Sequence, residues 1–509
     1  MKAFLMYRDQ DFHLHTDLPS NAADLTKDLG LETLFDAMAG GDEFLLGIVK
    51  TAVLRSIPES DAILYRQDVF KDCIGHSDLV RQIYSIAVEA IERERRVWGW
   101  ISEIPSSALH RAVDVLKIFS ALLKQLRQVA DEHASEFRSE GFQRFFGMLT
   151  RELDDEYLRK IEEHLRRLEF LNGVLMSAEL NKDLKGTNYI LRKLPDVKLS
   201  WKERVQSWLG WGSKSLVYEI ADRDEGGFRA LSEIQSRGIG HVAAALGQST
   251  DHILSFFQML RLEIGFYIAC LNLCERLRGK GEPFCFPEPL AAGPQALSAR
   301  GIYDVCLSLS MDTRAVGNDV AAENKALIVI TGANRGGKST LLRSIGQAQV
   351  MMQCGMFVPA ESFRGNVCWG VSTHFKREED ASMKSGKLDE ELKRMSSIVE
   401  KITPNSAILL NESFASTNER EGSEIARQIV HALLDSSVKV FYVTHLFDLA
   451  HGFHAEERRD ALFLRAERLP DGRRTFRLIE GEPLPTSHGE DLYRRVFAEC
   501  RSASPNQAS

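Results

Sequence analysis

The spacing of apolar residues divides the chain into two regions of different character. From about Asp28 to Pro287, apolar residues recur at intervals of three and four with charges between them, as in LVRQIYSIAVEAIERERRVWGWI and DHILSFFQMLRLEIGFYIACLNLCERL. This spacing places them on one face of a helix, so we predict long amphipathic helices with few strands. The charge on YLRKIEEHLRRLEFLNGVL is typical of extended, partly solvated rods that suit levers.

Two breaks interrupt this helical pattern. Between Glu179 and Gly227 several Gly residues and Pro195 weaken it, and LVYEI is one strand-like run. We place a distal tip there, at about 180–227. The second break, GKGEPFCFPEPLAAGP, is rich in Gly and Pro and predicts that the helical region ends near residue 290.

Short β-type runs alternate with helices from roughly Ala296 onward. The runs KALIVITG, NSAILLNES and VKVFYVTH flank predicted helices at Lys338–Met352 and Glu421–Leu434. Such alternation predicts a parallel α/β sheet with its ligand at the carboxyl ends of the strands. The fold class is therefore multidomain, α followed by α/β. The expected parts are an N-terminal segment (1–27), a helical core, lever and clamp region (28–290), an α/β domain (296–500) and a disordered tail (501–509).

Composition narrows the class of protein. The formal net charge is −8, so the chain is not one of the strongly basic proteins whose charge alone indicates nucleic-acid binding. Its eight cysteines are scattered without a CxxC pair, which argues against a disulfide framework or zinc site. No stretch approaches the roughly 20 apolar residues of a membrane span. We expect a cytoplasmic protein that does not bind membranes.

The segment TGANRGGKST matches the phosphate-loop pattern G-x-x-x-x-G-K-[ST]. It lies between a predicted strand and a predicted helix, where glycines let backbone N–H groups surround phosphate oxygens. Lys338 supplies a charge to the β and γ phosphates, and Ser339 can ligate Mg²⁺. A glycine-rich turn without a ligand is the alternative. The expected ATP-binding residues are Gly332, Ala333, Asn334, Arg335, Gly336, Gly337, Lys338, Ser339 and Thr340.

Two further candidates end neighbouring β-runs. Glu412 follows SAILL and Asn411, and it is positioned to orient or deprotonate an attacking water. Asn411 stands where such sites usually carry a metal-binding Asp, so weaker Mg²⁺ binding and slower turnover are expected. His445 ends VKVFYVTH, where a neutral imidazole can contact the γ-phosphate or the water. The alternatives are a solvated strand end and a structural histidine.

These motifs, taken in order, resemble those of the MutS family. TGANRGGKST, CGMFVPA, NESFASTNEREG, FYVTHLFDLA and PTSHGEDL are similar to successive segments of its ATPase domain, from about Ala296 to Arg494. DLGLETLFDAMAG and ILYRQDVFKD resemble more loosely the entry to its helical core. The resemblance implies that Asn334, Gly337, Lys338 and Ser339 bind nucleotide and magnesium. It also implies that Glu412 is the catalytic acid and His445 the γ-phosphate sensor.

The resemblance also implies a homodimer whose subunits complete each other's sites. Within MKSGKLDEELKRM, Ser385 is the candidate that reaches the partner's γ-phosphate, with Lys387 assisting, and Thr417 and Glu421 match positions that couple the site to the partner. Only about 27 residues precede the helical core. Mismatch reading is therefore not implied.

The predicted tip carries a local excess of positive charge. Lys193, Lys198, Lys202 and Arg204 lie among Trp201, Trp208 and Trp211. Basic side chains neutralise DNA phosphates and aromatic side chains stack on bases, although a solvated helix with inward-packed tryptophans fits equally well. The resulting hypothesis is a homodimeric, ATP-driven clamp on double-stranded or branched DNA, serving repair or recombination. The alternative is a nucleotide-gated scaffold that binds a protein partner or membrane surface.

Overall fold

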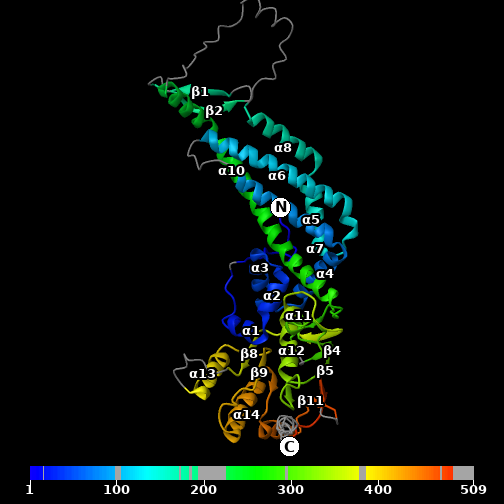
Figure 1. The fold of residues 1–509 in the computed structure, drawn as a ribbon. Helices are drawn as coiled ribbons and strands as arrows, with labels where there is room; N and C mark the ends of the chain where they lie inside the picture. Colours follow the sequence, from blue (N-terminus) through cyan, green and yellow to red (C-terminus); the bar gives the residue numbers. More distant parts are fainter. Residues whose placement is uncertain are drawn as a thin grey trace, which may run out of the picture. The chain divides into compact units, whose positions relative to one another are not determined.

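The computed structural model divides the chain into two compact units (Figure 1). The first contains residues 1–3, 81–137 and 143–261, and the second contains residues 4–80, 138–142 and 262–509. Most of the amino-terminal 80 residues therefore pack with the carboxyl-terminal region, while the domain bounds suggested by the sequence pattern stay a prediction. The structure describes residues 1–14, 16–97, 105–170, 174–182, 186–192, 225–292, 296–377, 386–469 and 473–484.

Helices form most of the first unit. Leu109 and Val113 of α6 meet Leu165 of α8 and Ile239 of α10 in one apolar core, in which all four side chains are buried. Leu109, Val113 and Leu116 of α6 follow at intervals of four and three residues, the spacing of an amphipathic helix, so the predicted long helices are confirmed here. The elements are α5 (Ser77–Arg96), α6 (Pro105–His133), a 3-10 turn (Ala134–Glu136), α7 (Glu140–Glu152), α8 (Asp155–Leu168) and α10 (Glu225–Gly279), of which α10 continues into the second unit.

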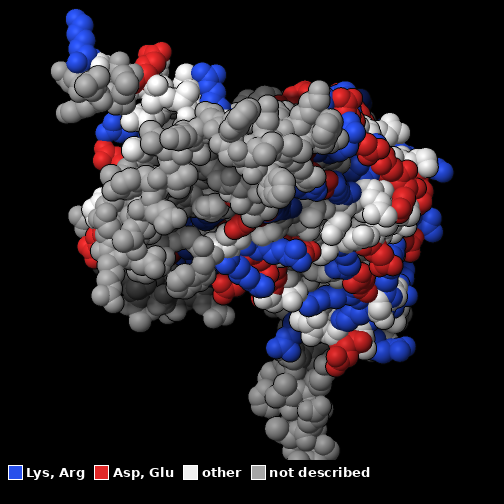
Figure 2. Space-filling view, turned by 90° about the horizontal axis from the view of Figure 1, so that it is seen from above, with Lys and Arg blue, Asp and Glu red and all other residues white. Residues whose placement is uncertain are grey.

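Charged side chains of both signs cover the outer faces of these helices. Glu156 and Lys160 of α8 form an i,i+4 ion pair at 2.6 Å. Figure 2 shows Lys and Arg interspersed with Asp and Glu among the described residues of one face. Exposed pairs of this kind contribute at most about 1 kcal/mol each, so the apolar core supplies most of the stability of the helices.

A β-hairpin lies where the sequence pattern predicted the end of a helical stretch and the start of the distal tip. Strands β1 (Leu175–Leu180) and β2 (Gly186–Arg192) pair antiparallel, with Leu175 opposite Arg192. The predicted helical stretch YLRKIEEHLRRLEFLNGVL therefore ends as helix at Leu168, and Phe170 has a positive φ of 50°. LVYEI and most of the predicted tip lie outside the described residues.

Helix α10 corrects the expectation that no stretch of the chain is apolar enough to span a membrane. Residues Ser236–Gly279 of α10 are long and apolar enough to cross a membrane by length and composition alone. However, 61% of the most apolar window is buried within the protein, as in the core helix of a soluble protein. Because such a core helix passes the same test, it is weak evidence for a membrane span.

Two β-sheets and their covering helices form the second unit. The larger sheet has the strand order β12-β11-β6-β10-β9-β8 and is parallel except for β12, and the smaller has the order β3-β7-β4-β5. The strands are β3 (Glu288–Leu290), β4 (Leu297–Ile302), β5 (Asn318–Ala321), β6 (Leu327–Thr331), β7 (Ser362–Asn366), β8 (Val371–Phe375), β9 (Ala407–Asn411), β10 (Lys439–Val443), β11 (Ala461–Arg468) and β12 (Arg474–Glu480). The helices are α1 (Ala22–Leu29), α2 (Leu31–Ala39), α3 (Glu43–Leu54), α4 (Ser60–Gly75), α11 (Val305–Ser310), α12 (Lys338–Gln353), α13 (Lys387–Val399), α14 (Glu419–Asp435) and α15 (Phe447–Ala455).

The central strands of the larger sheet are buried on both faces. Ile408 and Val440 point into a core shared with Val430 of α14 and Leu449 of α15. Leu409, the next residue of β9, points the other way, toward Gly346 of α12. Continuous apolar runs are typical of parallel strands covered on both sides, so the three predicted strands and the helices between them are confirmed. This sheet positions the candidate site.

Candidate functional site

Glycines shape the phosphate loop between β6 and α12. Gly332 and Gly337 have φ values of 113° and 95°, a left-handed region that other residues rarely adopt. A Cβ on Gly332 would lie 2.8 Å from the backbone nitrogen of Ala466, and one on Gly337 would lie 3.0 Å from the carbonyl oxygen of Phe476. Both positions therefore exclude a side chain. Asn334 and Arg335, between them, are exposed.

Lys338 is held inside this loop. Its side chain is 4% exposed, and its ammonium group donates to the carbonyl oxygens of Gly332 at 2.9 Å and Ala333 at 3.0 Å. Burial lowers the pKa of Lys338 to about 8, an effect that the nearby Glu412 carboxylate partly offsets. A phosphate bound by the loop would meet a cation that is already desolvated.

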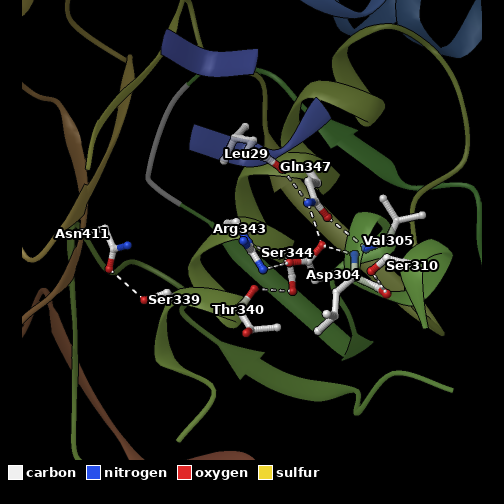
Figure 3. A network of polar contacts seen from close by, with 11 residues as sticks. Leu29, Asp304, Val305, Ser310, Ser339, Thr340, Arg343, Ser344, Gln347 and Asn411 are labelled. Carbon is white, nitrogen blue, oxygen red and sulfur yellow. Dashed lines mark hydrogen bonds and ion pairs between the residues drawn. The ribbon is translucent and has the colours of Figure 1, made fainter. Parts of the chain in front are cut away.

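The first hydroxyl of α12 faces the end of β9. The Ser339 hydroxyl donates a hydrogen bond to Oδ1 of Asn411 at 3.0 Å (Figure 3). Asn411 is the last residue of β9 and pairs in register with Val443 of β10. A hydroxyl and an amide oxygen are ligands that Mg²⁺ accepts, so these two residues fit that ion, but the amide brings no negative charge.

Glu412 and His445 meet at the carboxyl ends of two adjacent strands. His445 Nε2 lies 2.8 Å from Glu412 Oε1, and the two side chains are 25% and 30% exposed. This hydrogen bond lowers the pKa of the Glu412 carboxyl; burial opposes the effect, and the charges of His445, Lys338 and Lys376 add to it. Glu412 is therefore an ionised carboxylate that reaches solvent beside the phosphate loop.

A buried polar network fixes the loop that follows Glu412. Tyr442 donates to the Ser413 carbonyl at 2.7 Å, and His374 Nδ1 lies 2.7 Å from the Ser413 hydroxyl. Burial lowers the pKa of His374 to about 4. Glu391 of α13 accepts from the Phe414 N–H at 2.8 Å. This network was not predicted: His374 stands in no motif, and Glu391, although it lies within MKSGKLDEELKRM, has no spacing that links it to Phe414.

A second buried network anchors the phosphate-loop helix (Figure 3). Arg343 of α12 forms an ion pair at 2.8 Å with the fully buried Asp304, which also caps α11. Gln347, one turn further along α12, donates to Asp304 Oδ1 at 2.8 Å and to the Leu29 carbonyl at 2.9 Å. α12 is thereby joined to α11 and to the end of α1. These residues too were missed from the sequence.

A cavity of about 500 Å³ is lined by residues outside the phosphate loop. Its lining includes Asn318, Arg314 and Arg477. The Asn318 amide donates at 3.3 Å to the carbonyl of Phe476, the same carbonyl that approaches Gly337. The volume lies within the roughly 300–1,000 Å³ of small-molecule sites.

The structure places the candidates of the phosphate loop, Glu412 and His445 close together, while other candidates lie outside the described residues. Gly336 closes a turn by donating to the Ala333 carbonyl at 3.2 Å, and the Thr340 carbonyl accepts from Ser344 at 2.8 Å. Thr417, just before α14, donates to Glu421 in the first turn of that helix at 2.6 Å. Ser385, the tip residues Lys193, Lys198, Lys202 and Arg204, and the tip tryptophans lie outside the described residues.

Two known protein families match separate parts of the chain. Residues 59–280 match the family described as MutS2 N-terminal domain. Residues 328–491 match the family described as MutS domain V, a stretch that contains all of the site residues described above from Gly332 to His445.

Curated relatives carry MutS names. The chain is 28% identical to MutS protein homolog 4 of Mus musculus over 246 residues, which is 47% of this chain and 24% of that protein. It is 30% identical to the DNA mismatch repair protein MutS of Petrotoga mobilis, over 34% of this chain and 21% of the relative. It is 31% identical to Endonuclease MutS2 of Thermus thermophilus, over 33% and 23%. The matched segments thus span less than a quarter of the length of these relatives.

Proposed function

This chain belongs to the MutS family, and on that premise we propose that it binds and hydrolyses ATP to control its binding to DNA. The observation that carries the proposal is the contact between Glu412 and His445, at 2.8 Å, beside the glycine-rich phosphate loop. It combines a carboxylate of lowered pKa with an imidazole on the neighbouring strand. A phosphate loop alone is compatible with simple nucleotide binding. The added acid supports hydrolysis.

In this proposal each residue has a defined role. The loop N–H groups and Lys338 bind the β and γ phosphates, and the cavity beside Asn318 receives the base. Ser339 and Asn411 hold Mg²⁺, which neutralises phosphate charge when it is bound. Glu412 orients the attacking water and takes up its proton, and His445 fixes the direction of that carboxylate.

The partners follow from family membership. The relatives named above include a DNA mismatch repair protein and an endonuclease of the MutS2 type, so double-stranded or branched DNA is the proposed ligand, in repair or recombination. We propose a homodimer in which Ser385 of one subunit contacts the nucleotide of the other. ATP then acts as a switch, and hydrolysis resets it.

Steady-state ATP turnover with and without duplex or branched DNA tests the proposal. We expect DNA-dependent turnover by the wild type, which falls by about 10²–10⁴-fold in Glu412→Ala while nucleotide binding persists. Lys338→Ala should lose both binding and turnover. Glu400→Ala, an exposed site at the end of α13, is the matched control and should behave as the wild type.

Two outcomes would count against it. Nucleotide binding without turnover in the wild type would contradict the enzymatic part. Turnover that no DNA alters, together with a protein that stays monomeric with ATP, would contradict the clamp and favour a nucleotide-gated scaffold.

A further inference from the structure

The loop after β9 is held in an unfavourable backbone conformation. Glu412 and Phe414 have φ values of 55° and 63°, which non-glycine residues adopt at a cost of about 1 kcal/mol or more each. The ring of Phe414 is fully buried and stacks on His374 with centroids 5.5 Å apart. Gly422 of α14 lies against its carbonyl, where a Cβ would come within 2.4 Å. The conformation therefore needs contacts that fix it.

Glu391 supplies two of these contacts from a different element. Its side chain projects from α13 and is 6% exposed. One carboxylate oxygen accepts from the Phe414 N–H at 2.8 Å, and the other accepts from the Ser416 hydroxyl at 2.7 Å. Hydrogen bonds to a carboxylate are about twice as strong as neutral ones. Both oxygens thus hold one short loop.

We propose that Glu391 is a positioning residue for ATP hydrolysis, acting through the Phe414 backbone on the direction of the Glu412 carboxylate. This inference rests on the proposed function, in which Glu412 handles the attacking water. In this proposal Glu391 acts through its contacts with Phe414 and Ser416 and not by binding nucleotide or water. Its contact lies two residues beyond Glu412, so a change of φ at Phe414 rotates the chain that carries the acid.

Contacts on the other face of the loop hold Ser413 independently of Glu391. Tyr442 and His374 hold Ser413 from the β10 and β8 sides, as described above. Glu391 holds the following residue from α13. With Glu391 removed, Ser413 stays bound while Phe414 is released. The loop would turn about Ser413 rather than unfold, and binding through the phosphate loop should survive.

The test compares Glu391→Ala and Glu391→Gln in the full chain, with Glu400→Gln as the matched control at the exposed residue that follows the C-terminal end of α13. Glutamine keeps the shape and one acceptor, so it retains the Phe414 bond but loses the acceptor for Ser416. We expect kcat per nucleotide-binding site to fall about tenfold in the alanine variant and about threefold in the glutamine variant. KM and nucleotide Kd should stay within about twofold of the wild type.

Hydrogen exchange of the Phe414 amide gives a readout that does not need turnover. Protection should fall in Glu391→Ala, be partly retained in Glu391→Gln and be unchanged in Glu400→Gln. Loss of Phe414 protection with unchanged kcat would overturn the inference, as would an equal loss of nucleotide binding. A wild type that protects Phe414 but has no turnover would instead show that the proposed function has failed, and the positioning role would fail with it. If Glu391→Ala does not fold, Glu391→Gln decides.

Discussion

The phosphate loop and the loop after Glu412 both contain left-handed backbone, but they stabilise it differently. In the phosphate loop, Gly332 and Gly337 adopt positive φ at little cost, and close backbone neighbours leave no room for a side chain. In the second loop, Glu412 and Phe414 keep their side chains, and buried hydrogen bonds from other elements compensate for the strain. The glycines of the phosphate loop belong to a sequence motif and can be recognised from the sequence. The hydrogen bonds of the second loop come from distant residues and can be recognised only in the tertiary structure.

The largest expected effect comes from giving the phosphate loop a side chain. Gly332→Ala would place a Cβ 2.8 Å from the Ala466 nitrogen at a φ of 113°. We expect the unfolding free energy to fall by about 3 kcal/mol and nucleotide affinity to fall at least about a hundredfold. Denaturant titration and fluorescent-nucleotide binding measure the two effects.

Gly75→Ala is the control for this substitution. A Cβ there meets nothing within 4 Å, and the residue lies in α4. We expect stability to stay equal or rise slightly, because alanine favours helix. Equal nucleotide affinity in Gly332→Ala and Gly75→Ala would show that the loop does not require its glycines.

A hydrogen bond from Ser339 to Asn411 joins the helix that follows the phosphate loop to the strand that precedes the second loop. Asn411→Asp adds a negative charge beside the proposed magnesium position. The apparent Mg²⁺ affinity in nucleotide binding should tighten about tenfold, and Asn411→Ala should weaken it. A Mg²⁺ titration at fixed nucleotide tests this. Identical titrations for all three proteins would remove Asn411 from the metal site.

A smaller effect is expected when one bond to the second loop is removed. Tyr442→Phe deletes the hydroxyl that donates to the buried Ser413 carbonyl at 2.7 Å. The unfolding free energy should fall by about 1–2 kcal/mol, because the carbonyl loses its partner. Tyr157→Phe, at a side chain that is 49% exposed, should change it by less than about 0.5 kcal/mol. A loss no larger in Tyr442→Phe than in Tyr157→Phe would mean that the loop does not depend on this bond.

The smallest expected effect is a shift in the titration of Glu412. Its pKa lies below the ordinary 4.5, first because of the hydrogen bond from His445. At pH values above the ordinary pKa this interaction stabilises the folded protein, and the stabilisation is lost as the pH falls through the lowered pKa. His445→Ala should therefore raise the Glu412 pKa, as followed by NMR of the labelled carboxyl carbon. His451→Ala, at an exposed residue of α15, should leave it unchanged. A Glu412 titration that is the same in both variants would contradict the pairing.

Sequence reasoning succeeded where structure is encoded locally. The apolar runs of β6, β9 and β10 and the phosphate loop were predicted because continuous buried strands and glycine spacing leave a direct trace. Since parallel strands end at one edge, the proximity of Glu412 and His445 also followed. The hairpin was missed because β1 follows directly on a strongly helical stretch, and β2 lies where the helical pattern weakens without a clear strand pattern. The four-stranded sheet was missed because its strands are short and half-polar. In β7 only Phe363 and Gly365 are buried, and no apolar run marks the strand.

The contacts that fix the site were beyond that reasoning. His374 and Ser413 are 39 positions apart, and Asp304 and Gln347 are 43 apart. No spacing rule connects such residues, since their meeting depends on how helices pack on the sheet. A buried histidine or glutamine also carries no sequence signal of its own. Only the tertiary structure identifies them.

The Asp304 network has a consequence for how this protein can evolve. One buried carboxylate serves the cap of α11, the charge of Arg343 and the amide of Gln347 at once. Loss of any one partner leaves the others with unmet charge or hydrogen bonds, so single replacements are selected against, while a joint replacement is tolerated. Among relatives of this chain, the three residues should therefore be inherited, or exchanged, as a set.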